Sequence, residues 1–366
     1  MLASKPVATT PTGKRGGRSI AISEFVTRYG VVIAWLLVIG VFSALKPQTF
    51  ATWANFQTIF GSQSVLLILT LGLVLSLSVG ELDLSIAGVM AVAVVLVGHL
   101  NVTHHVPVVP TILIVLLFGL LAGLVNAFFV VVVGVESIVV TLGMGTLLSG
   151  IAVAINVETV SGISESLVNA VRGHLLGLPY SFWYAILLTV IVWYLFSLTP
   201  LGRRMHFVRV GPQVARLSGV RVDRIRAGAL VATSLIASLA GIVQASPLAA
   251  SSPTVSAAYL LPAFSAAFLG STTIQPGRFN AWGTFVGVYF LVTGITGLEL
   301  LGLSGWIENV FYGGSLVLAV ALSRLVARYQ RRLKIKEGQL GESASKPTAD
   351  TRAAGETARL PGGEER

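Results

Sequence analysis

Long blocks of apolar residues alternate along this chain with shorter polar segments. A run of roughly 17–25 apolar residues crosses a bilayer as a helix, because a helix satisfies its own backbone hydrogen bonds where no water is available. The strands of a membrane β-barrel would instead alternate apolar and polar residues over about ten positions, and these blocks do not. We therefore predict an all-α polytopic membrane protein with about ten transmembrane helices. The predicted spans are Tyr29–Leu45, Ile59–Val79, Leu84–Leu100, Thr111–Val133, Ile138–Ile155, Phe182–Leu198, Ala227–Ala245, Ala257–Gly270, Ala281–Leu298 and Trp306–Leu322.

The composition agrees with this prediction, because hydrophobic residues make up 54% of the 366 positions and charged residues only 11%. A soluble domain usually carries about a quarter charged residues, so this chain lacks the charges to cover a soluble protein of its size. It also contains no cysteine, which excludes disulfides and thiolate metal sites. We expect neither a metal nor a cofactor.

The basic residues give the chain a net charge of +10, which invites a nucleic-acid interpretation. They lie at the edges of the apolar blocks, however, so we predict no nucleic-acid partner. Cytoplasmic loops of membrane proteins carry the excess of Lys and Arg. Threading ten spans from a cytoplasmic N-terminus leaves 23 of the 25 basic residues inside. One span more or fewer in the middle would destroy this asymmetry, so both termini are expected in the cytoplasm.

The same pattern divides the chain into parts. Residues 1–28 form a polar, basic cytoplasmic tail, residues 29–323 form the transmembrane domain, and residues 324–366 form a second cytoplasmic tail that is expected to be partly disordered.

Ten spans can be divided into two halves of five. Because five is odd, the second half would enter the membrane from the opposite face, which is the arrangement of an inverted repeat. The third and eighth spans would then correspond. Polar segments precede both of them, Gly80–Asp83 and Ser246–Ser256.

Two acidic residues, Glu81 and Asp83, lie between the second and third spans. Acidic groups at membrane depth are costly and usually functional, which favours a role in the translocation pathway or in gating. The alternative is helix capping, because the side chains of Asp83 and Ser85 can accept hydrogen bonds from the first-turn amides of the third span. The residues alone leave both alternatives open.

Asn126 lies in the fourth span, shortly after Gly119 and Gly123. Glycines four residues apart let two helices approach closely. Asn126 would then form an interhelical amide bond, and a role in the pathway is the alternative.

The loop from Leu201 to Arg226 holds the densest basic cluster: Arg203, Arg204, Arg209, Arg216, Arg221, Arg224 and Arg226. Such a cluster marks topology and attracts anionic membrane lipids, or it forms a docking surface. We predict a short helix over Gln213–Ser218, because Pro212 stands at its start and Gly219 just past its end.

On the outer side, Asn156–Ser181 is the largest polar segment and offers a place where a soluble partner could dock.

Five stretches of the chain resemble the permease subunits of the ribose-type sugar ABC importers. They cover roughly residues 30–325 in the order and spacing of that family. They are Gly72 through Gly80-Glu81-Leu82-Asp83-Leu84-Ser85-Ile86-Ala87-Gly88; Ile138-Val139-Val140-Thr141-Leu142-Gly143; Thr199-Pro200-Leu201-Gly202-Arg203 followed by Ala215-Arg216-Leu217-Ser218-Gly219-Val220; Leu269-Gly270-Ser271-Thr272 with Gly283-Thr284 downstream; and Gly297-Leu298-Glu299-Leu300-Leu301-Gly302-Leu303-Ser304.

This resemblance implies a subunit of the inner membrane of a bacterium that translocates a sugar or a similar small polar solute. It also implies partners: ATP-binding subunits, a second permease subunit that would form a homodimer, and an extracytoplasmic solute-binding protein. Segment 199–226 would be the cytoplasmic coupling loop. Residues implied in coupling to the ATPase are Gly202, Arg203, Ala215, Arg216, Leu217, Ser218 and Gly219. Residues expected in the pathway or its gating are Glu81, Asp83, Ser85, Asn126, Thr141 and Thr272.

The chain departs from the family pattern at three places. Arg209-Val210-Gly211 stands where the family has Gly-Gly-Asn, Gly270-Ser271-Thr272 where it has Gly-Gly-Thr, and Pro276-Gly277 where it has a Gly-Gly pair. These departures concern the details of coupling and gating.

No Gly-x-x-x-x-Gly-Lys-Ser/Thr motif occurs in the sequence, so we do not expect this chain to hydrolyse ATP through a P-loop, and we predict no catalytic residues. The alternative functions are an ion-coupled secondary transporter that works without an ATPase, and a membrane scaffold that transports nothing. A proton-coupled transporter usually has more ionisable groups inside its spans than this sequence has.

Overall fold

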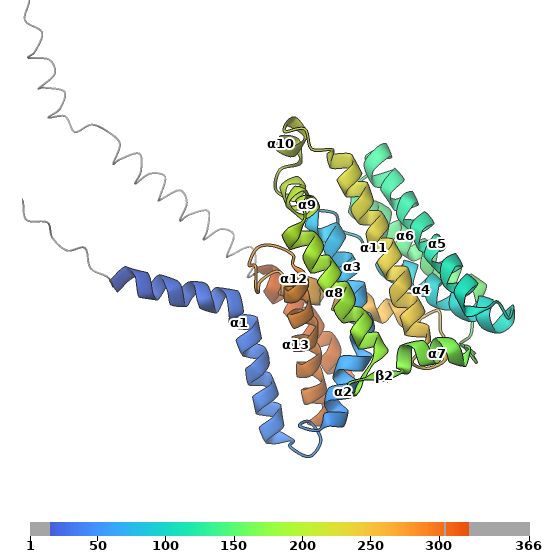
Figure 1. Ribbon diagram of the computed structural model, residues 1–366, viewed down its shortest axis with the longest axis horizontal. Helices are drawn as coiled ribbons and strands as arrows, with labels where there is room; N and C mark the ends of the chain where they lie inside the picture. Colours follow the sequence, from blue (N-terminus) through green and yellow to red (C-terminus); the bar gives the residue numbers. More distant parts are fainter. Residues whose placement is uncertain (1–14, 304, 322–366) are drawn as a thin grey trace, which may run out of the picture. The chain divides into compact units, whose positions relative to one another are not determined.

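The computed structural model describes residues 15–303 and 305–321, which are predominantly helical (Figure 1). The helices are α1 Arg15–Leu45, α2 Trp53–Ser62, α3 Ser64–Ser78, α4 Ile86–Gly98, α5 Val108–Ala127, α6 Ser137–Ile155, α7 Glu165–Arg172, α8 Tyr180–Leu198, α9 Pro200–Val210, α10 Pro212–Leu217, α11 Val222–Ala245, α12 Leu260–Gly270, α13 Ala281–Leu300, and a last helix Trp306–Ala321.

Shorter elements extend or connect these helices. Two π-helical segments continue α4 and α5, η1 His99–Thr103 and η2 Phe128–Val133, and a 3₁₀ turn, η3 Val255–Tyr259, precedes α12. Two antiparallel pairs of two-residue strands lie in the loops. They are β1 Val160–Ser161 with β4 Ala250–Ser251, and β2 His174–Leu175 with β3 Leu178–Pro179.

Eight of the helical stretches in the described residues are long and apolar enough to cross a membrane. They match the predicted spans, except that shorter apolar helices stand at the eighth and tenth places, Val255–Gly270 and Trp306–Ala321. The predicted all-α membrane fold is thereby confirmed. The count of ten spans and the five-plus-five repeat stay predictions.

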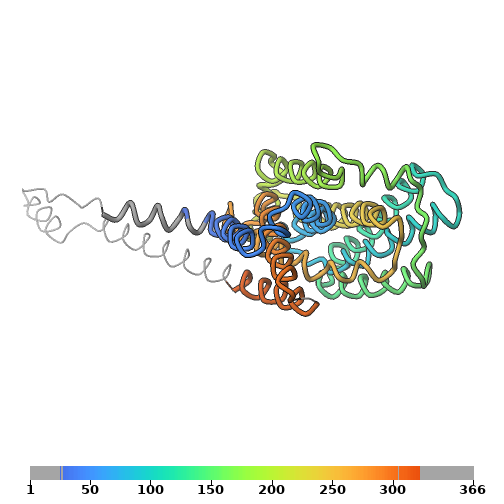
Figure 2. The backbone as a smooth tube through the Cα atoms, turned by 90° about the horizontal axis from the view of Figure 1, so that it is seen from below, coloured from blue at the N-terminus to red at the C-terminus, as the bar shows by residue number. Residues whose placement is uncertain are grey.

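The core of the bundle is formed by α3, α4 and α11. Every residue of α3 is buried, and so is every residue of α4 except Leu96. Helix α11 packs against α3, α4 and α5, and in Figure 2 it runs as a yellow tube through the middle of the bundle. The outer helices α5, α6 and α8 expose Leu, Ile and Val side chains, as expected of helix faces in contact with lipid.

Glycines allow the closest helix contacts. At Gly123 of α5, an added Cβ would lie 2.7 Å from the Cα atom of Val231 in α11, and at Gly119 it would overlap Ser238. The close contact predicted for this glycine pair is therefore confirmed, and the partner helix is α11. At Gly88 of α4, a Cβ would lie 2.5 Å from the carbonyl oxygen of Gly145 in α6.

Contacts between the loops fall into two groups at opposite ends of the bundle. We call the end that carries α9 and α10 the α9 end, and the end that carries α7 and the start of α2 the α7 end (Figure 1). At the α9 end, Glu81 pairs with Arg226, and Thr273 bonds to the carbonyl of Arg28. At the α7 end, β1 pairs with β4. Both groups fit the predicted threading.

Some predicted boundaries differ from the structure. Helix α1 begins at Arg15, inside the predicted tail 1–28, because the helix continues past the apolar stretch that spans the membrane. The third span starts at Ile86 instead of Leu84, because the linker before it is extended. Residues 1–14 and the predicted C-terminal tail 324–366 lie outside the described residues.

Candidate functional site

Polar side chains from four parts of the chain meet inside the α9 end. We call them the buried polar cluster, and they are Glu81, Asp83 and Ser85 from the linker between α3 and α4, Asn126 from α5, Ser137 and Thr141 from α6, and Arg226 from α11. The linker is not helical because α3 ends at Ser78, and Gly80 just beyond it has a φ of +94°, in the left-handed region that favours glycine.

A chain of hydrogen bonds connects Asn126, Ser85 and Asp83. The Asn126 amide donates to the Ser85 hydroxyl (2.8 Å), and that hydroxyl donates to Asp83 Oδ1 (2.6 Å). All three side chains are fully buried. The interhelical amide bond predicted for Asn126 is confirmed, and its acceptor is Ser85. Asp83 Oδ2 and Asn126 Oδ1 have no hydrogen-bond partner within the described residues.

The capping role considered for Ser85 is wrong. Ser85 is the N-cap residue of α4, but its side chain accepts no hydrogen bond from the first turn. Asp83 Oδ1 accepts from the backbone amide of Ser85 itself (2.9 Å). Burial raises the pKa of Asp83 to about 6, and the two hydrogen bonds from Ser85 oppose this shift.

Helix α6 satisfies the backbone of the extended linker. The Leu84 amide donates to the Thr141 hydroxyl (3.0 Å), and the Leu82 amide donates to Ser137 Oγ (3.3 Å). The single proton of the Thr141 hydroxyl is shared between the carbonyls of Leu82 (3.0 Å) and Ser137 (2.7 Å). Buried backbone groups outside secondary structure need such partners. Thr141 therefore holds the linker in place.

Glu81 forms an ion pair with Arg226 near the start of α11. The Glu81 side chain is only 7% exposed and that of Arg226 is 29% exposed, so the pair is largely shielded from water. Sequence reasoning placed Arg226 in the basic loop and missed this pairing. The two residues stand 145 positions apart, and no local pattern joins them.

The coupling segment 199–226 folds into α9, α10 and the start of α11. Thr199 accepts a hydrogen bond from the Gly202 amide (3.3 Å) and so caps α9. Helix α10 starts at Pro212 and ends before Gly219, whose φ is +79°. The predicted short helix is confirmed, shifted by one residue.

The residues expected to couple to the ATPase divide into two groups. Gly202 and Ala215 are buried and hold the segment on the bundle. Arg203, Arg216, Leu217, Ser218 and Gly219 are exposed. The Leu217 side chain is 89% exposed and Val214 beside it is 58% exposed, so α10 presents an apolar face to its surroundings.

Thr272 is the only expected pathway residue that takes no part in the buried polar cluster, as far as the described residues go. Its hydroxyl donates to the Leu269 carbonyl (2.7 Å) in the turn after α12. No group of three His, Asp or Glu residues able to hold a metal ion occurs in the described residues.

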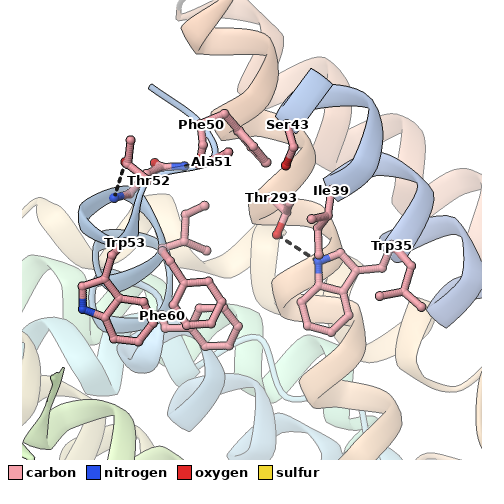
Figure 3. A pocket seen from close by; sticks show the side chains of 13 residues that line it. Trp35, Ile39, Ser43, Phe50, Ala51, Thr52, Trp53, Phe60 and Thr293 are labelled. Carbon is pink, nitrogen blue, oxygen red and sulfur yellow. Dashed lines mark hydrogen bonds between the residues drawn. The ribbon is translucent and has the colours of Figure 1, made fainter. Parts of the chain in front are cut away.

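An apolar cavity of about 460 Å³ lies between α1, α2 and α13 (Figure 3). The Trp35 indole crosses it and donates to Thr293 Oγ1 (3.0 Å), while Trp53 and Phe60 face it from α2. Sequence reasoning missed this cavity, because Thr293, the hydrogen-bond partner of Trp35, lies 258 positions away in the chain.

Residues 55–320 match the family described as branched-chain amino acid transport system / permease component. Among curated proteins, the D-allose transport system permease protein AlsC of Escherichia coli (strain K12) is 25% identical over 83% of this chain and 94% of its own length.

Two further relatives are similar over most of their length. The ribose import permease protein RbsC of Haemophilus influenzae is 26% identical over 82% of this chain and 94% of its own. The autoinducer 2 import system permease protein LsrC of Enterobacter sp. (strain 638) is 31% identical over 86% and 92%. No solved structure matched the chain.

Proposed function

The chain belongs to the branched-chain amino acid transport system / permease component family, and we propose that it translocates a sugar as the membrane-spanning subunit of an ABC importer. The names of its relatives support this substrate class, since two of them are permeases for the monosaccharides allose and ribose. Because the autoinducer 2 import permease is also similar to this chain, a small polar solute other than a sugar is the second candidate substrate.

A permease of this kind is a transport component and not an enzyme. It works with ATP-binding subunits and with a binding protein that delivers the solute, and this sequence has no P-loop motif of its own. The protein is a multi-pass protein of the inner membrane. We further propose that the α9 end faces the cytoplasm, which the excess of Lys and Arg in segment 199–226 supports.

The Glu81–Arg226 ion pair carries the proposed mechanism. Arg226 ends the coupling segment, and Glu81 belongs to the linker that the buried polar cluster holds between α3 and α4. A displacement of α9 and α10 by the ATPase would therefore reach the linker through this pair. We assign gating of the pathway to Glu81, Asp83, Ser85, Asn126 and Thr141 on this basis. Thr272 stays a candidate through its motif alone.

We propose that the second permease subunit is another copy of this chain and packs on α6. Gly143, Thr146 and Gly150 lie on one exposed face of this helix, and an added Cβ at either glycine would meet nothing within 4 Å. Small residues at four-residue spacing, such as Thr146 and Gly150, favour close helix contacts in membranes.

The test uses the purified chain with its ATP-binding subunits and binding protein in liposomes. Leu217→Ser removes the most exposed apolar side chain of α10. We expect it to lower the stimulation of ATP hydrolysis by loaded binding protein at least about fivefold, because burying a leucine contributes roughly 1.5–3 kcal/mol. Leu187→Ser is the matched control, since Leu187 is 59% exposed on α8 and lies outside both the coupling segment and the outer loops.

Unchanged stimulation in Leu217→Ser would remove α10 from the coupling role. Uptake driven by an ion gradient in liposomes that contain this chain alone would contradict the importer itself and support a secondary transporter.

A further inference from the structure

A second cavity at the α9 end has a different chemistry from the buried polar cluster. It has a volume of about 260 Å³ and lies between α9 and the loop that connects α12 to α13. Its lining residues are Ser78, Phe196, Gly202, Arg203, His206, Arg209, Gln275, Arg278 and Phe279. Three of these carry guanidinium groups, and none carries a carboxylate.

None of the three guanidinium groups has an anionic partner in the part of the chain that the structure describes. Within the described residues, the ion pairs are Arg216–Asp223 and Glu81–Arg226, so Arg203, Arg209 and Arg278 have none. Arg209 is half-buried, and its guanidinium carbon lies 4.4 Å from the centre of the Phe279 ring. Arg203 and Arg278 are exposed beside it. Three like charges that converge on one cavity, one of them half-buried, attract an anion that would neutralise them.

The loop that carries Arg278 is held in position by Asn280. The Asn280 amide donates to the carbonyls of Gly270 (3.2 Å), Thr273 (3.1 Å) and Arg278 (3.2 Å), and its oxygen accepts from the Gly283 amide (2.6 Å). Arg209 is fixed from the other side by α9. The cavity therefore presents its basic side chains from two well-held elements, as a preformed site does.

The pKa of His206 reflects both burial and the positive charge around this cavity. Burial lowers the pKa of its imidazole, and the charges of Arg278 and Arg209 lower it further. The imidazole can therefore act as a neutral hydrogen-bonding group beside three cations, and Gln275 and Ser78 add neutral polar groups to the lining.

We propose that this cavity binds a phosphate group, carried by a small phosphorylated metabolite or by an anionic lipid. A phosphate offers several strong acceptor oxygens and up to two charges near neutral pH, which suits several guanidinium groups at once. The cavity is smaller than the roughly 300 Å³ at which pockets for drug-sized ligands begin, so the phosphate would carry only a short organic part into it. The Phe196 and Phe279 rings line the space beside the cations.

The cavity shares Gly202 and Arg203 with the residues expected to couple to the ATPase, but phosphate binding is measured on this chain alone, so its test needs neither transport nor the ATPase. The full chain is purified in an alkyl maltoside, which contains no phosphate, and orthophosphate binding is measured by equilibrium dialysis against chloride of equal ionic strength. The double variant Arg209→Gln/Arg278→Gln should weaken binding at least about tenfold, because one hydrogen bond to a charged group contributes roughly this much. Arg204→Gln is the matched control, since Arg204 is exposed on the same helix but does not line the cavity. It should change binding less than about twofold.

A second variant and a second ligand complete the test. Arg209→Lys/Arg278→Lys keeps the charge and should retain part of the affinity, and an unchanged elution volume shows that each variant folds. Retention of phosphatidylglycerol by the wild type, reversed by orthophosphate and absent from the Gln variant, identifies the source as a lipid headgroup. Orthophosphate binding with no lipid retained identifies a soluble phosphate. Equal binding of both ligands by the wild type and the Gln variant overturns the proposal. No binding of either ligand also overturns it, and would mean that the guanidinium groups pair with a carboxylate of a partner subunit.

Discussion

At the residue scale, Asp83 shows how a buried carboxyl group can respond to pH. Its side chain is fully buried, and one of its oxygens has no partner among the described residues. Ser85 donates two hydrogen bonds to the other oxygen, which favours the charged form, but the loss of water outweighs them and raises the pKa to about 6. The folded protein therefore holds the proton of Asp83 more tightly than the unfolded chain does.

This difference makes stability depend on pH in one window. Below about pH 4, Asp83 is protonated in both states. Between about pH 4 and pH 6 only the unfolded chain ionises this group, so the free energy of unfolding falls by about 3 kcal/mol in total and then levels off above about pH 6, where both states ionise. We expect Asp83→Asn to remove this contribution in denaturant unfolding between pH 4 and 7. Asp223→Asn changes an exposed carboxyl and should leave the profile as it is. Parallel profiles for wild type and Asp83→Asn would contradict the assignment.

The two ion pairs of the described residues allow a matched comparison. Arg226→Met leaves Glu81 charged and buried, which should lower the free energy of unfolding by about 3–5 kcal/mol. Arg216→Met breaks the exposed pair with Asp223 and should cost at most about 1 kcal/mol. Adding Glu81→Gln to Arg226→Met should recover most of the loss, because no uncompensated charge is then left. A similar cost for both single variants would mean that Glu81 is solvated.

At the scale of the elements, the bundle depends on backbones that nearly touch. Helix α4 approaches α6 at Gly88, and α5 approaches α11 at Gly119 and Gly123. These contacts place α6 and α5 close enough for Thr141 and Asn126 to reach the linker before α4. The glycine contacts therefore position the polar cluster as well as the helices.

Gly88→Ala tests this dependence. The added Cβ would collide with the carbonyl of Gly145, so we expect a loss of about 1–3 kcal/mol in unfolding free energy. Gly228→Ala, on α11, meets nothing within 4 Å and should be neutral or stabilise the helix by up to about 1 kcal/mol. If both variants unfold alike, the α4–α6 contact is looser than described.

At the scale of the whole molecule, the proposed dimer makes the most direct prediction. The sequence contains no cysteine, so introduced thiols react without background. Thr146→Cys on the exposed face of α6 should give a disulfide-linked dimer under mild oxidation, seen as a doubled mass on a denaturing gel. Leu187→Cys on α8 is also exposed, at 59% for the native leucine, and should stay monomeric. Cross-linking at Leu187→Cys alone would move the interface to α8.

How far the sequence predicts this molecule depends on the range of each interaction. The apolar blocks predict the helices because lipid requires each span to be apolar along its own length. The motif residues Asp83, Ser85, Asn126 and Thr141 meet in one cluster, as expected of a site. The partners of Glu81, Arg209 and Trp35 could not be predicted, because each contact joins segments that come together only in the packed bundle.

The sequence distance between Glu81 and Arg226 has a consequence for biosynthesis. A ribosome adds about 5–20 residues per second, so the 145 positions that separate the pair take on the order of ten seconds to translate. The nascent chain therefore delivers Glu81 to the membrane well before its partner exists. An unpaired acidic group is costly at membrane depth, so the linker that carries Glu81 must stay in contact with water during that interval. Completion of the α9 end is therefore a late event in the biogenesis of this permease.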